Sequence, residues 1–84
     1  MKKIIINAFG KDKPGIVAKI SGIIKSFNGN IEISKMIQLE TDFTALMLVE
    51  ISDDNITTLT NSLKKIKNLN ITINKTGTKS NSNN

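Results

Sequence analysis

The fold is decided by one stretch of the chain, Gly10-Lys-Asp-Lys-Pro-Gly-Ile-Val-Ala-Lys19, which follows the apolar run Ile4-Ile5-Ile6. Gly10 and Gly15 permit backbone geometry that a Cβ would hinder. Pro14 suits the first position of a helix because its ring holds φ near the helical value. The stretch therefore predicts a strand, a tight loop and a helix start, a junction at which unpaired backbone N–H groups can bind an anion.

Apolar and polar residues alternate in four segments of the chain, which predicts four strands. These segments cover residues 3–9, 31–39, 43–51 and 69–74. Helical periodicity runs over residues 14–27, and the tripeptide Asn28-Gly29-Asn30 ends that helix because glycine is favoured after the last turn. A second helix follows the capping residues Ser52-Asp53-Asp54, with an apolar stripe from Ile56 to Ile66.

The element order βαββαβ predicts an α+β fold, a ferredoxin-like sandwich whose four-stranded antiparallel sheet carries both helices on one face. The third strand is apolar on both sides at mid-length, so it is expected in a central position. Lys35 falls on the apolar side of the second strand and indicates a local irregularity or an edge position. The other sheet face is left open, and it is expected to carry Ile5, Met36, Leu46 and Leu48. Such a patch favours association, so we expect a homodimer or a higher homo-oligomer.

Composition excludes several function classes. The 84 residues form one domain with a net charge of +5, and they include neither His, Cys nor Arg. Without these residues, and with dispersed carboxylates, the chain is not expected to be an enzyme, to bind a metal or to need a cofactor. The scattered lysines lack interleaved aromatic residues, which argues against direct nucleic-acid binding. No apolar run is long enough for a membrane span, so a cytoplasmic location is expected.

The loop after the first strand is the candidate ligand site. An amino-acid carboxylate can bind the N–H groups of Gly15, Ile16 and Val17, Asp12 can hold an ammonium group, and Asn30 supplies an adaptable amide. Each residue also has an ordinary structural interpretation. Asp12 can stabilise the helix start, Gly15 can permit close packing, and Asn30 can be a turn residue.

The sequence Asp12-Lys-Pro-Gly-Ile-Val17, followed by Ile20-Ser21 and later by Gly29-Asn30-Ile31, resembles the ACT domain. The resemblance covers roughly residues 2–75, so residues 1–75 are expected to form the domain and residues 76–84 a disordered polar tail. The segment Asp42–Val49 is similar to the third strand of the subgroup that includes the glycine cleavage system repressor, and the chain resembles the small stand-alone proteins of that subgroup.

The resemblance implies an allosteric regulatory module that binds an amino acid between two protomers. The loop side would comprise Asp12, Pro14, Gly15 and Ile16, and the neighbouring protomer would contribute Asn30 and Ile31. Serine-sensing relatives have a His and an Asn where this chain has Gly10 and Asp12, so serine specificity is not carried over.

Two functions follow from this sequence. The first is a sensor that binds an amino acid at a dimer interface and modulates an unidentified protein partner, either a transcription factor or a metabolic enzyme. The alternative is a ligand-free interaction module that uses the open sheet face.

Overall fold

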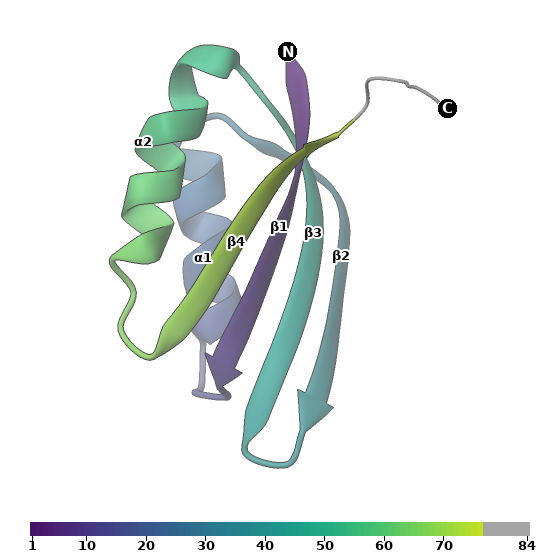
Figure 1. Ribbon diagram of the computed structural model, residues 1–84, viewed down its shortest axis with the longest axis vertical. Coiled ribbons are helices and arrows are strands. Elements are labelled where there is room, and N and C mark those ends of the chain that lie inside the picture. The colour runs from purple at the N-terminus through teal and green to yellow at the C-terminus, as the bar shows by residue number, and fades with distance from the viewer. Residues whose placement is uncertain (77–84) are drawn as a thin grey trace.

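The structure, a computed structural model, describes residues 1–76 of the chain. Its elements are β1 (Lys2–Lys11), α1 (Ile16–Ser26), β2 (Asn30–Leu39), β3 (Asp42–Ile51), α2 (Asp53–Lys64) and β4 (Leu69–Thr76). Both helices lie on one side of a single sheet (Figure 1), which confirms the predicted ferredoxin-like βαββαβ sandwich. Residues 77–84, most of the expected tail, lie outside the described residues, and Thr76 is part of β4 rather than of that tail.

The strand order in the sheet is β2-β3-β1-β4, and all neighbouring strands are antiparallel. The third strand is therefore central, as its apolar faces predicted. The core lies between the sheet and the two helices, and its largest fully buried side chains are Phe43, Ile4, Ile6, Ile20, Ile24, Ile51, Leu59, Leu63 and Val49. Burying one such side chain stabilises the fold by roughly 1.5–3 kcal/mol.

A bulge in β2 reverses the side-chain alternation of this strand. Ile31 pairs with Val49, but Ile33 pairs with Leu48, because the register shifts by one residue between them. A shift of one residue moves every following side chain to the opposite face. Lys35 thus marks an irregular edge strand, as predicted.

The same bulge makes one prediction wrong. Met36 pairs with Ala45, whose side chain is buried toward the helices, so Met36 lies on the helix side and not on the open face. The open face instead receives Ile33, Ile37 and Leu39, which are all more than half exposed.

The first helix ends where the sequence predicted, although a different residue turns the chain. Asn28 has the left-handed φ of 62°, its N–H donates to Lys25, and the N–H of Gly29 donates to the Ile24 carbonyl. This is the Schellman pattern, with asparagine in the position usually held by glycine. A Cβ on Gly29 would lie 2.7 Å from the Ile24 side chain, so glycine is needed there for close approach.

The second helix begins at its predicted cap. The Ser52 hydroxyl accepts from the N–H of Asp54, and Asp53 and Asp54 occupy the first turn. Ile66, at the end of the predicted apolar stripe, lies beyond the helix and packs against the core from the connection to β4. No helix in residues 1–76 has the length and apolar character needed to cross a membrane.

Candidate functional site

A tight turn, rather than a helix, contains Pro14 and Gly15. The N–H of Ile16 donates to the Lys13 carbonyl over 3.1 Å, and Gly15 has φ 77° and ψ 5°. Proline followed by a glycine of positive φ is the sequence of a type II turn. The helix consequently starts at Ile16, and the prediction that Pro14 occupies its first position is wrong.

This turn also changes the expected set of anion donors. We expected from the sequence that the N–H groups of Gly15, Ile16 and Val17 would donate to a ligand carboxylate. The Ile16 N–H instead donates to the Lys13 carbonyl within the turn. Gly15 is still required, because its left-handed conformation costs other residues about 1–2 kcal/mol. Gly10 is required for another reason: a Cβ there would lie 2.3 Å from the Asn68 carbonyl oxygen.

Asp12 is held in place by the hairpin between β2 and β3. Its N–H donates to the Thr41 carbonyl over 2.9 Å, and its Oδ2 accepts a hydrogen bond from the Gln38 side-chain amide. The Asp12 side chain is half-buried. Sequence reasoning missed Gln38, because its approach to Asp12 depends on the strand order and register that place the end of β2 and the end of β1 on either side of the start of β3. The short hairpin at Glu40-Thr41 was the available signal.

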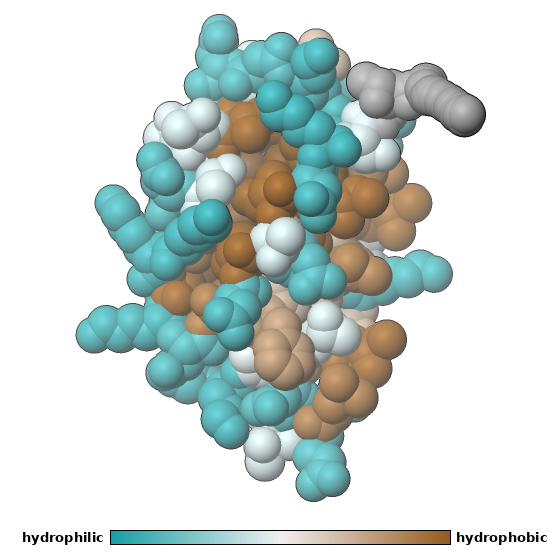
Figure 2. Space-filling view, in the orientation of Figure 1, coloured by the Kyte–Doolittle hydropathy of each residue, from teal (hydrophilic) through white to brown (hydrophobic). Residues whose placement is uncertain are grey.

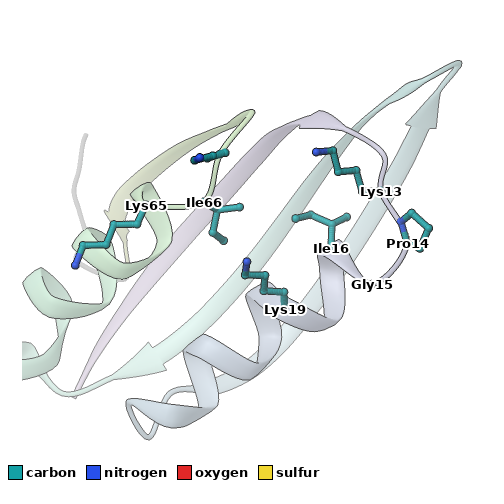
Figure 3. A pocket seen from close by; sticks show the side chains of 8 residues that line it. Lys13, Pro14, Gly15, Ile16, Lys19, Lys65 and Ile66 are labelled. Atoms are coloured by element: carbon teal, nitrogen blue, oxygen red, sulfur yellow. The ribbon is translucent and has the colours of Figure 1, made fainter.

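A cavity of about 460 Å³ lies on the helix side of the turn (Figure 3). Its lining comprises Lys13, Pro14, Gly15, Ile16, Lys19, Lys65, Ile66 and Lys67. Three predicted site residues, Pro14, Gly15 and Ile16, are therefore brought together. Asp12 does not line this cavity.

Asn30 and Ile31 lie at the opposite end of the sheet from the loop. Asn30 pairs with Glu50, which pairs with Lys3, whereas Lys11 at the other end of β1 pairs with Asp42. Eight residues of extended strand separate the two ends, a distance of roughly 26 Å. One chain therefore cannot bring all six predicted residues together.

The open sheet face carries a second, apolar depression of about 300 Å³. It is lined by Ile5, Ile33, Lys35, Leu46, Met47 and Leu48. Three of these residues, Ile5, Leu46 and Leu48, were predicted to lie on this face. Figure 2 shows apolar side chains reaching the surface along the side of the molecule where β2 lies.

The comparisons with known proteins agree with the fold. The family model of the ACT domain matches residues 2–75. The chain belongs to the ACT domain family. This ACT domain is a regulatory module, and the family match covers nearly all the described residues.

The proteins similar in sequence to this ACT domain include a UPF0237 protein and a transcriptional repressor. It is 36% identical over 56 residues to a UPF0237 protein of Methanopyrus kandleri, covering 67% of this chain and 62% of the relative. It is 38% identical over 60 residues to the glycine cleavage system transcriptional repressor of Escherichia coli, covering 71% of this chain and 32% of the repressor.

A similar solved structure comes from the same group. A crystal structure provisionally assigned as a glycine cleavage system transcriptional repressor matches with a TM-score of 0.84 and 26% identity, over 95% of this chain and 48% of that chain. This ACT domain thus spans less than two thirds of the length of each of these three proteins.

Proposed function

We propose that this ACT domain is a cytoplasmic regulatory protein that forms a homodimer, binds an amino acid between two copies and modulates a protein partner. The single observation that carries the proposal is the double anchoring of Asp12, through its N–H by Thr41 and through its carboxylate by Gln38. A half-buried carboxylate held in one place beside a turn is suited to accept hydrogen bonds from a ligand ammonium group.

The carboxylate has capacity for such a ligand. An ionised Asp side chain offers about four acceptor positions on its two oxygens, and Gln38 uses one of them. The remaining positions can accept from an ammonium group without displacing Gln38.

The position of β2 supports a site shared between two copies. This strand is an edge strand of ten residues, and its backbone can pair with a second copy across a two-fold axis. Antiparallel pairing would bring the start of one β2 beside the end of the other. Asn30 and Ile31 of one copy would then lie near Gln38 of its neighbour, and hence near Asp12. In such a dimer, Asn30 and Asp12 would come together from two different copies, although roughly 26 Å separates the two ends of the sheet within one chain.

A thermal-shift screen against the twenty amino acids tests the ligand. At millimolar concentration at least one amino acid should raise the melting temperature, because a ligand that binds only the folded state stabilises it. Asp12→Asn should abolish that response and leave the melting temperature of the free protein nearly unchanged. Asp53→Asn, the same chemical change at the start of α2, is the control and should respond like the wild type.

Mixing two inactive variants tests whether the site is shared. Each site of the proposed dimer takes Asp12 from one copy and Asn30 from the other. Asp12→Asn and Asn30→Ala chains should therefore be inactive alone but recover roughly a quarter of the sites when mixed in equal amounts. Failure to recover any binding would contradict a shared site, and a screen without any response would contradict amino-acid binding itself.

A second candidate function rests on the open sheet face. Ile5, Ile33, Leu46 and Leu48 form an apolar depression there. A ligand-free interaction module would use this face to bind a protein. In that case Leu46→Asp would abolish association while no amino acid shifted the melting temperature.

A further inference from the structure

The cavity beside the turn is lined by four lysines and by no acidic residue. Lys13 comes from the turn, Lys19 from the first turns of α1, and Lys65 and Lys67 from the connection between α2 and β4. Segments distant in the sequence thus contribute lysines to the lining of one cavity of about 460 Å³, a volume within the range of small-molecule sites.

Within residues 1–76, no carboxylate forms an ion pair with any of these four lysines. The ion pairs of this part of the chain join Lys3 to Glu32 and Lys11 to Asp42, and both lie outside the cavity. The start of α1, which has no acidic residue in its first turn, contributes the positive end of its helix dipole, while the C-terminal end of α2 beside Lys65 contributes a negative end. An anion placed here would reduce the mutual repulsion of the ammonium groups.

The shape of the cavity distinguishes it from a uniformly polar surface. Ile16 and Ile66 lie between the lysines, and in Figure 3 Lys13 and Lys19 extend on either side of Ile16. Both isoleucines are partly buried and pack against the core. The cavity therefore offers apolar side chains for the organic part of a ligand beside cationic side chains.

We propose that this cavity binds a small organic phosphate. A lysine ammonium is a compact point charge that suits phosphate oxygens. A phosphate group carries about −1.5 to −2 charges at neutral pH and matches four lysines better than a single carboxylate does. The site lies within one chain, and Asp12 does not line it, so the inference goes beyond the amino-acid site and does not require it.

Isothermal titration with inorganic pyrophosphate tests the charged part of this site. Binding should be saturable, and sulfate at equal ionic strength should bind more weakly. The double variant Lys13→Gln/Lys19→Gln should weaken pyrophosphate binding at least about tenfold, because it removes two charge-assisted contacts. The control Lys2→Gln/Lys25→Gln removes the same charge outside the cavity and should bind like the wild type.

Two results would overturn the proposal. One is equal weakening by both double variants, which would show that only the net charge of the protein matters. The other is equal binding of sulfate and pyrophosphate, which would indicate an unspecific response to anions. Asp12→Asn separates this site from the amino-acid site, because it should leave pyrophosphate binding intact whether or not an amino acid binds elsewhere.

Discussion

The starts of the two helices differ in whether the chain itself supplies a hydrogen-bond acceptor for the free backbone N–H groups and a negative charge for the positive end of the helix dipole. The helix α2 begins with Ser52, whose hydroxyl accepts from the N–H of Asp54, and it has Asp53 and Asp54 in its first turn. The helix α1 begins after Gly15, without a side-chain cap and without an acidic residue in its first turn. Both helices pack on the same sheet, so the difference lies in their local sequence.

This contrast separates a structural terminus from one suited to binding. At α2 the chain supplies its own hydrogen-bond acceptor and its own negative charge, which stabilises the helix directly. At α1 the chain supplies a glycine turn, and lysines surround the adjacent cavity. Leaving the positive end of a helix without a carboxylate of its own favours an external anion.

The largest expected effect on stability is at the turn that starts α1. Gly15→Ala should lower the free energy of unfolding by roughly 1–2 kcal/mol, because Gly15 has a φ of 77° that a Cβ disfavours. No neighbouring atom would touch the added Cβ, so the effect reports the backbone alone. Urea denaturation measures it.

Gly22→Ala is the matched control for this change. It makes the same substitution in the middle of α1, where an added Cβ also meets no neighbour. In an ordinary helical conformation alanine should raise stability by about 0.5–1 kcal/mol. If both variants changed stability in the same direction, the special role of the Gly15 conformation would be refuted.

Removing the cap of α2 should have a smaller effect. Ser52→Ala should destabilise the protein by about 1 kcal/mol, because one backbone N–H loses its acceptor. Chemical denaturation measures the change. Binding of an amino acid or of pyrophosphate to the correctly folded variant should stay at the wild-type level, and a loss of either would contradict the view that this terminus is purely structural.

The smallest effect comes from making the start of α1 resemble that of α2. Ala18 lies in the first turn of α1 and is exposed. Ala18→Glu should be more stable than Ala18→Gln by about 0.5 kcal/mol, because the added charge complements the helix dipole and the nearby lysines. The same Glu variant should weaken pyrophosphate binding. Equal stability of the two variants, measured at low salt, would show that the charge has no influence there.

Much of the fold could be predicted from local patterns. Each helix and strand has its own apolar periodicity, and six elements in the order βαββαβ leave few compatible topologies. The helix cap at Ser52 could also be predicted, because the capping residue and the two acidic residues of the first turn are consecutive in the sequence.

The candidate site was predictable only in part. Gly15 was identified correctly as a backbone requirement, but Pro14 was assigned to a helix because the first position of a helix and a type II turn both favour its φ. Met36 was assigned to the wrong face because alternation read from the sequence assumes an unbroken strand, and a bulge adds one residue.

The sequence by itself determined the architecture, the position of the candidate ligand loop along the chain, and the fact that no Cys, His or Arg side chain is available to a site. These properties depend on residue type and on spacing along the chain. The tertiary structure alone decided that Gln38 holds Asp12, that four lysines share one cavity, and that Asn30 lies at the far end of the sheet. Those relations join segments distant in the sequence, and strand register and helix packing set them.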